Sequence, residues 1–525
     1  MSATPSPPAP QPDHRSSNRW LVALAVMLAA VMEVLDMTIA NVALDHIRGS
    51  LSAGVDEAAW VLTSYIVSNA VVLPLTGWLG NYYGRKRFFS FCVVSFTISS
   101  FFCGAAPNLP MLVFFRIVQG ACGGALMPMS QAILFETFPP QEHAKAMAVW
   151  GIGMMLGPIL GPILGGWITD NYSWRWIFYI NLPLGTVAFF LVNWLVEDPS
   201  YVKREIKRID WWGLSFLVLS IGSMQIVLDK GERLDWFSSD VIVTLTIVSG
   251  VTLLLFIIQE FRTPEPIVDL RVFKNRTFAV GTMVTTIVMF ALYGTMVLTP
   301  LYCQLIAGYT PFLAGKVLAF QYIGTFLSIM LAGRLFNRID PRLLVFAGCI
   351  AAGIGAWDMT HFYPEIGYWE IAVPGLFRGL GSGLIFVPLT TLSMGAVPKE
   401  HMGTASGLFN MVRTVGGSVG IAILITLLSR GAQVHQQYLT VHVHPYNPEV
   451  WQRISLITNS ASPSLAGTGA HEGSLLALIY HGVQRQALLL SFLDDFRLVA
   501  YTFFFLAPFV FLMRRPRAPG PPSAH

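Results

Sequence analysis

The chain has 525 residues, of which 54% are hydrophobic and only 12% are charged, and its mean hydropathy is +0.59. Soluble domains carry about 25% charged residues, so this composition excludes an ordinary soluble globular protein. The formal net charge of +4 comes from basic residues spread over many short connections. A nucleic-acid-binding surface would cluster them on one face, so we expect no nucleic acid as a partner.

The first nineteen residues are rich in Pro and Ser, which predicts a disordered tail over residues 1–19. Apolar blocks of about twenty residues follow, each long enough to cross a hydrocarbon core of roughly 30 Å. The chain is thus expected to be an all-α polytopic protein of the lipid bilayer. We place fourteen spans at 20–44, 58–79, 88–105, 110–135, 144–168, 176–196, 211–229, 241–260, 277–299, 313–335, 343–362, 372–394, 404–428 and 497–513.

Lys and Arg gather in alternate connections, such as GRKR at 84–87, KREIKR at 203–208 and RRPR at 514–517. Because short cytoplasmic loops carry the excess of basic residues, this bias predicts that both termini, including the tail 514–525, are cytoplasmic. An even number of spans agrees with that topology.

Asp36 lies in the middle of the first apolar run, within VMEVLDMTIANVAL. An ionised side chain there costs on the order of 3 kcal/mol on insertion scales, so it usually faces a protein interior or a watery cavity and has a function. We interpret Asp36 as a proton carrier. Glu33, one helical turn before it, is a second candidate. The alternative is that either carboxylate only caps or hydrogen-bonds a neighbouring helix without titrating.

Arg116 lies in the fourth span and must find a carboxylate, a carbonyl or water there. We interpret it as the electrostatic partner of a carboxylate such as Asp36, and the alternative is a snorkelling anchor near the end of its span. In the second half, the repeat described next places Leu292 opposite Asp36. Arg378 and Arg413 therefore lack an equivalent acid, and we expect proton coupling in the first half.

Short motifs recur between the two ends of the chain. GWLGN at 77–81 recurs as GRLFN at 333–337, and PQEH at 140–143 recurs as PKEH at 398–401. Spans 1–6 therefore correspond to spans 9–14, and spans 7 and 8 are left over. This divides the chain into a six-helix half at 20–196, an inserted hairpin with its flanking loops at 197–276, and a six-helix half at 277–513.

Two parallel six-helix repeats resemble the plan of the major facilitator superfamily, whose substrate site lies near the midplane between the halves. LDMTIANVAL (35–44), RIVQGACGG (116–124), GPILGPILGG (157–166) and WRWIFYINLPLG (174–185) are similar to motifs of its fourteen-span drug/proton antiporter branch, in particular of EmrB-like efflux permeases. The likeness covers nearly the whole chain. It implies protons as the coupling ion, no cofactor, and hydrophobic drug-like substrates. It also implies that the protein is located in the bacterial cytoplasmic (inner) membrane.

Two segments are expected to govern the conformational change. The loop after the second span resembles the family pattern at Gly77, Gly84 and Arg85, but Asn81 and Tyr82 replace the usual charged residues, which places a charge-pair gate there in doubt. In the fifth span, small residues recur every four positions and let helices approach closely, while prolines bend the helix. The resemblance implies that this interface bends or seals. Its residues are Gly153, Gly157, Pro158, Gly161, Pro162 and Gly165.

Soft or amphipathic side chains in the spans that line the cavity are candidates for substrate contact, because they repack around dissimilar apolar ligands. Each of them has the alternative of packing helices or facing lipid. The candidates are Asn41, Asn69, Gln119, Gln131, Trp150, Met154, Met155, Tyr293, Gln321, Tyr322 and Asn410.

One long extracytoplasmic connection is expected at 430–496, with a helix-like apolar segment at 473–492. It is either a capping loop or a docking surface, and the resemblance implies a periplasmic adaptor protein and an outer-membrane channel as partners. Its histidines lack the Cys or clustered carboxylates of a convincing metal site.

No H-E-x-x-H, G-x-S-x-G or ATP-binding G-x-x-x-x-G-K-[ST] pattern occurs in the sequence, so an enzyme is not expected. The sequence favours a proton-coupled antiporter that exports hydrophobic or amphipathic drugs. A proton-coupled importer of a small metabolite is the alternative, and a non-transporting membrane receptor or scaffold is a third possibility that would not need Asp36 or Arg116.

Overall fold

The computed structural model describes residues 19–197, 210–263, 266–441, 443 and 471–513. Within these residues the secondary structure is entirely helical, and fourteen helical segments are long and apolar enough to cross a membrane. The fourteen predicted spans are thus confirmed. The tails expected at 1–19 and 514–525 lie outside the described residues, apart from Arg19.

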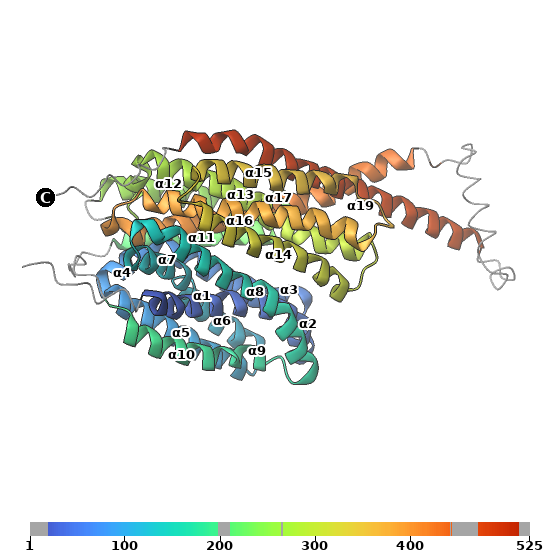
Figure 1. Ribbon diagram of the computed structural model, residues 1–525. Helices are drawn as coiled ribbons and strands as arrows, with labels where there is room; N and C mark the ends of the chain where they lie inside the picture. Colours follow the sequence, from blue (N-terminus) through green and yellow to red (C-terminus); the bar gives the residue numbers. More distant parts are fainter. Residues whose placement is uncertain (1–18, 198–209, 264–265, 442, 444–470, 514–525) are drawn as a thin grey trace, which may run out of the picture.

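The N-terminal six-helix half forms the lower bundle in Figure 1, and the C-terminal half lies above it. Some of the six spans of the first half consist of two consecutive helices, so the half contains more helices than spans. They are α1 (Arg19–Val42), α2 (Leu44–Ser50), α3 (Val55–Val72), α4 (Thr76–Tyr83), α5 (Arg85–Ala105), α6 (Leu109–Gly123), α7 (Leu126–Thr137), α8 (His143–Asn171), α9 (Trp176–Tyr179) and α10 (Asn181–Leu195). The second comprises α13 (Arg276–Leu305), α14 (Pro311–Leu335), α15 (Pro341–Asp358), α16 (Tyr368–Gly395), α17 (Met402–Thr440) and α19 (His471–Leu506).

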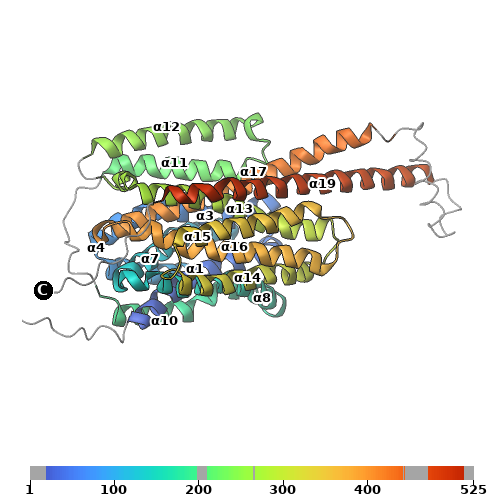
Figure 2. The same cartoon turned by 45° about the horizontal axis from the view of Figure 1, so that its top comes forward.

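The inserted hairpin consists of α11 (Trp211–Lys230) and α12 (Asp240–Arg262), and Figure 2 shows it on the outside of the molecule. α11 packs against α3 of the first half and α17 of the second. Gln225 on α11 donates to Ser418 Oγ (2.9 Å), and Thr63 donates to Asp229 Oδ2 (2.5 Å). The hairpin is therefore peripheral, and it bridges the two halves.

The two ends of the bundle differ. The terminal end is the end at which α1 begins and at which the short helix after α19 finishes (Figure 1). The opposite end, from which α17 and α19 project, is the projecting end. Toward the terminal end the halves are in direct contact. A Cβ atom on Gly77 would lie 2.2 Å from the backbone nitrogen of Thr404, and Ser406 donates to the carbonyl of Pro128 (2.7 Å). This state is closed at the terminal end.

The glycine stripe of the fifth span packs on α1. Cβ atoms added at Gly153, Gly157 and Gly161 would overlap the side chains of Met27, Val34 and Thr38, respectively, all on α1. Thr38 Oγ1 also donates to the carbonyl of Gly157 (3.1 Å). Glycine is required at these positions because side chains of α1 occupy the space that a Cβ atom on α8 would take. The sequence predicted this close approach from the spacing of the small residues.

The long connection is shorter than expected. The sequence placed spans at 404–428 and 497–513 with a loop at 430–496, whereas α17 continues to Thr440 and α19 begins at His471. The predicted helical segment at 473–492 is confirmed. At about 1.5 Å per residue, the 39 residues of α17 extend roughly 58 Å, well beyond a hydrocarbon core of about 30 Å. Hydropathy detected only the part inside the membrane.

The contact between α1 and α8 predicts a position-dependent effect of enlarging glycine. Gly161→Val should lower the free energy of unfolding of the purified protein by about 1–3 kcal/mol, and so its melting midpoint, because the new side chain overlaps Thr38. Gly166→Val is the matched control on the same helix, since a Cβ there meets nothing within 4 Å. Melting curves of the two variants in detergent decide the matter, and equal midpoints would contradict the packing described here.

Candidate functional site

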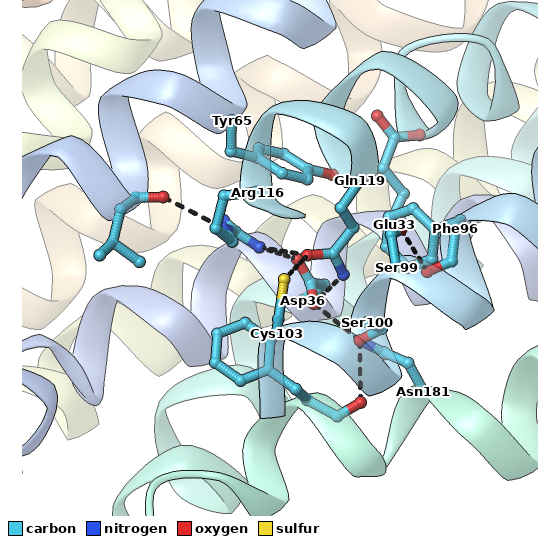
Figure 3. A network of polar contacts seen from close by, with 12 residues as sticks. Glu33, Asp36, Tyr65, Phe96, Ser99, Ser100, Cys103, Arg116, Gln119 and Asn181 are labelled. Atoms are coloured by element: carbon cyan, nitrogen blue, oxygen red, sulfur yellow. Dashed lines mark hydrogen bonds and ion pairs between the residues drawn. The ribbon is translucent and has the colours of Figure 1, made fainter. Parts of the chain in front are cut away.

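Asp36 is held by three donors from two other helices. Its Oδ2 accepts from Arg116 Nη1 at 2.6 Å, and its Oδ1 accepts from Gln119 Nε2 at 2.8 Å and from Asn181 Nδ2 at 2.7 Å. Figure 3 shows these side chains converging on the carboxylate from α6 and α10. The structure thus brings Asp36 and Arg116 together as an ion pair, whereas their role in proton coupling stays a prediction.

Arg116 is fixed on its other sides as well. Its Nε donates to the carbonyl of Val61 on α3 (3.0 Å), its Nη1 also donates to Gln119 Oε1 (2.9 Å), and its guanidinium carbon lies 4.1 Å from the centre of the Tyr65 ring. The side chain is 0% exposed. A snorkelling anchor would reach the membrane surface, so that alternative is wrong.

The ion pair is buried from water, with Asp36 only 2% exposed. Removing two charges from water costs several kcal/mol per ion, and this is offset only where geometry is good and further hydrogen bonds satisfy both groups. Gln119 and Asn181 supply such bonds to the carboxylate. Losing either charge therefore leaves the other one uncompensated in the interior.

Glu33 lies apart from this network although it is one turn away on α1 (Figure 3). Its Oε1 accepts from Asn69 Nδ2 at 2.8 Å, and its Oε2 has no hydrogen-bond partner within the described part of the chain. Across the contact between the halves, Arg413 Nη2 lies 2.5 Å from Met127 Sδ. The two carboxylates of α1 thus have different surroundings, and only Asp36 has a bound cation.

The loop after α4 keeps an ion pair despite its unusual sequence. Arg85 is 1% exposed and pairs with Glu136 at the end of α7. Gly84 has φ = +88°, a conformation that glycine adopts without strain. Asn81 is half-buried. The acid that the family pattern places at position 81 is therefore not needed to neutralise Arg85, because Glu136 does so from another helix.

The structure divides the predicted substrate contacts into three groups. Gln119 is 0% exposed and belongs to the Asp36 network, and Asn69 binds Glu33. A second group lies where the halves meet: Asn410 donates to Gln131 (2.7 Å), and Trp150 stacks on Phe386 (6.1 Å between ring centres), with Met154 buried nearby on α8. The third group is exposed or half-buried and comprises Asn41, Met155, Tyr293, Gln321 and Tyr322.

Sequence reasoning missed Asn181, Tyr65 and Glu136. Asn181 was within the quoted run WRWIFYINLPLG, and it is a single amide in an apolar stretch, which is the signal that could have found it. Tyr65 and Glu136 gave no such signal. No three His, Cys, Asp or Glu side chains in the described ranges are grouped as metal ligands.

The buried pair predicts strong coupling between two substitutions. Arg116→Gln should destabilise the protein by about 3–5 kcal/mol because Asp36 remains buried without its cation, and adding Asp36→Asn should recover much of that loss. Thermal unfolding of both single variants and the double variant measures the coupling.

The control cycle is Asp494→Asn with Arg497→Gln, a pair at 3.0 Å whose side chains are about half exposed. Its coupling should stay below about 1 kcal/mol. Additive effects of Asp36 and Arg116 would show that the pair contributes nothing as a unit.

Comparisons with known proteins agree with this architecture. Residues 26–421 match the model of the Major Facilitator Superfamily. The chain is 38% identical to the "Probable multidrug resistance protein EmrY" of Escherichia coli over 98% of this chain and 99% of the relative, and 37% identical to the "Multidrug export protein EmrB" of the same species over 95% and 96%. The solved structure of the proton:xylose symporter XylE has the same fold, with a TM-score of 0.60 at 12% identity, covering 96% of this chain and 97% of the symporter. The chain therefore belongs to the major facilitator superfamily and to its EmrB-like members.

Proposed function

We propose that this protein is a proton-coupled antiporter that exports hydrophobic or amphipathic drugs across the cytoplasmic membrane. The observation that carries the proposal is the buried pair of Asp36 and Arg116 between α1 and α6. The full-length similarity to proteins named for multidrug export supports the direction and the substrate class.

The proton is carried by Asp36 in this proposal. While Arg116 and the two amides hold the carboxylate, its negative charge is compensated. A movement of α1 relative to α6 separates the pair, and a carboxylate left alone in a low-dielectric interior takes up a proton. Protonation and conformation are then linked, as antiport requires. Glu33, with one oxygen unbound, is the second candidate for carrying a proton.

The close contact between α1 and the glycines of α8 couples the movements of these two helices. Gly153, Gly157 and Gly161 let α8 lie directly on the helix that carries Asp36, so a shift of α1 is transmitted to a helix that also contacts α14 and α16 of the other half. The contacts of Gly77 and Ser406 would open when the closed terminal end separates.

The terminal end faces the cytoplasm in this proposal, since the basic segments 84–87 and 337–342 connect helices at that end. A closed terminal end is then an outward-facing state, in which substrate leaves and a proton enters. At 100 mV, one charge crossing supplies about 2.3 kcal/mol, which supports roughly 50-fold accumulation of a neutral drug. The exposed or half-buried candidates Asn41, Met155, Tyr293, Gln321 and Tyr322 are proposed to contact the drug.

The projecting parts of α17 and α19 are proposed to dock a periplasmic adaptor protein, which would lead to an outer-membrane channel. His435 Nε2 lies 2.8 Å from Asp494 Oδ2 and links the two helices at the base of the projection. Further out, Tyr438 is 69% exposed and Tyr480 is 51% exposed. Exposed aromatic side chains on a projecting helix pair are typical of a protein interface.

The coupling role of Asp36 is tested by Asp36→Asn in proteoliposomes that carry an imposed proton gradient. The variant should insert and fold but lose gradient-driven transport of a fluorescent amphipathic dye, because an amide neither carries a proton nor releases one. Asp229→Asn is the control, since Asp229 is also on a spanning helix but binds Thr63 at the periphery. Uncoupler-sensitive transport by Asp36→Asn near the wild-type rate would refute the proposal.

The docking role is tested by replacing residues 437–481 with a flexible linker of about fifteen residues, which removes Tyr438 and Tyr480 but keeps the pair of His435 and Asp494. Resistance of whole Gram-negative cells should fall well below wild type while dye/proton exchange in proteoliposomes is retained, because only cells need an adaptor. An equal loss of both activities would assign the projection to the transporter's own fold, and unchanged resistance would remove the adaptor from the account.

A further inference from the structure

Arg378 on α16 is a buried cation with neutral partners. The side chain is 0% exposed. Its Nη1 donates to Thr299 Oγ1 (3.1 Å) and lies 3.4 Å from Met359 Sδ, and its Nη2 donates to Gln321 Oε1. No carboxylate lies within ion-pair distance of it in the described ranges of the chain, and its ionisable neighbours are Tyr322 and Cys303.

The contrast with Arg116 makes this arrangement informative. Arg116 and Arg378 occupy comparable places in the two halves, and each directs Nη1 at a side chain on the first helix of its half: Asp36 on α1 and Thr299 on α13. The sequence repeat had placed Leu292 opposite Asp36, and by its contact Thr299 is the residue there. Among the described residues, the guanidinium of the second half therefore has no carboxylate to balance its charge.

An uncompensated guanidinium inside a membrane protein is costly, and such residues usually mark a substrate or ion pathway. The unsatisfied part of Arg378 has a definite shape. Within the described part of the chain its Nε has no hydrogen-bond partner, and Nη2 is bound to Gln321 alone. The N–H bonds of Nε and Nη2 lie parallel along one edge of a guanidinium, and that edge matches the two oxygens of a carboxylate.

Space exists beside the residue that covers this edge. A Cβ added at Gly375, one turn before Arg378 on α16, would meet only the Cβ of Gln321, at 4.0 Å. Gln321 and Tyr322 are half-buried, so this part of α14 is not sealed as Arg378 is. Rotation of the Gln321 side chain toward that space would release Nη2 while the contact of Nη1 with Thr299 remains.

We propose that Arg378 binds the anionic head group of a carboxylate-bearing amphiphile, which displaces Gln321 Oε1 and takes both Nε–H and Nη2–H. The apolar tail of the ligand would extend past Tyr322. This site deepens the export function proposed above and rests on it for the direction of transport. Anionic and cationic substrates would then depend on different residues of one transporter.

The test measures equilibrium binding of decanoate to the full-length protein in nanodiscs, with empty nanodiscs subtracted and methyl decanoate as the uncharged probe. Wild type should bind decanoate at least tenfold more tightly than Arg378→Gln. Arg378→Lys should lie in between, because an ammonium keeps the charge but lacks the two parallel N–H donors of the guanidinium. Methyl decanoate should bind all three proteins alike.

Two further measurements separate a binding role from a structural one. Gly375→Val leaves Arg378 intact but fills the space into which Gln321 would turn, so it should weaken decanoate binding at least tenfold at unchanged melting temperature. Addition of decanoate should also raise the melting temperature of wild type and leave that of Arg378→Gln unchanged, because a ligand that binds the folded state stabilises it.

Equal decanoate affinity in wild type and Arg378→Gln would overturn the proposal. So would unchanged affinity in Gly375→Val. Failure of dye export by wild-type protein would instead refute the proposed function, while the binding comparison would still decide the role of Arg378.

Discussion

The structure of the first half depends on one constraint, the neutralisation of a carboxylate and a guanidinium that are both shut off from water. Asp36 and Arg116 can remain charged in the interior only because α3 offers a carbonyl, α6 offers Gln119 and α10 offers Asn181. The pair therefore fixes the relative positions of α1, α3, α6 and α10. The same requirement makes the pair responsive, since any displacement that lengthens the 2.6 Å contact raises the energy of both charges.

The two sides of α1 are packed differently. Polar contacts to α6 and α10 hold one side, whereas on the other side the side chains of α1 fill the positions left open by the glycines of α8, and Thr38 donates to the carbonyl of Gly157. These contacts hold α1 and α8 together, so we expect the two helices to move as one body when the Asp36 pair separates. The second half repeats the arginine but not the acid: Arg378 donates a hydrogen bond to Thr299, which is neutral. The halves are thus alike in fold and different in charge: among the described residues, Arg116 is paired with a carboxylate in the first half, whereas Arg378 in the second half has only neutral hydrogen-bond partners.

Much of this could be predicted from the sequence. The fourteen spans follow from the cost of exposing polar groups to hydrocarbon, the partnership of Asp36 with Arg116 follows from the cost of leaving either charge alone, and the close contact of α8 follows from its glycine spacing. The remaining features depend on how helices are rotated against one another. Asn181 and Glu136 are distant in sequence from Asp36 and Arg85, and no periodicity indicates that they point toward them.

The position of Thr299 was missed for the same reason, since a constant offset along the repeat does not specify which residue faces the arginine. The ends of α17 and α19 were missed for a different reason. Outside the membrane, a helix needs no apolar run, so hydropathy does not detect where it stops. The charged residues of the site were predictable, because a charged residue that stands alone in an apolar run is visible in the sequence. Most of their neutral hydrogen-bond partners could not be predicted.

The central claim is that Asp36 exchanges its ion pair for a proton during transport. Infrared difference spectroscopy of the reconstituted protein, recorded as an amphipathic drug is added, observes this directly through the carbonyl stretch of a protonated carboxyl group. The account predicts that drug binding removes such a band, with proton release to the medium, and that the signal is absent from Asp36→Asn. A wild-type spectrum in which the drug binds without any change in that band, or an unchanged signal in Asp36→Asn, would contradict it.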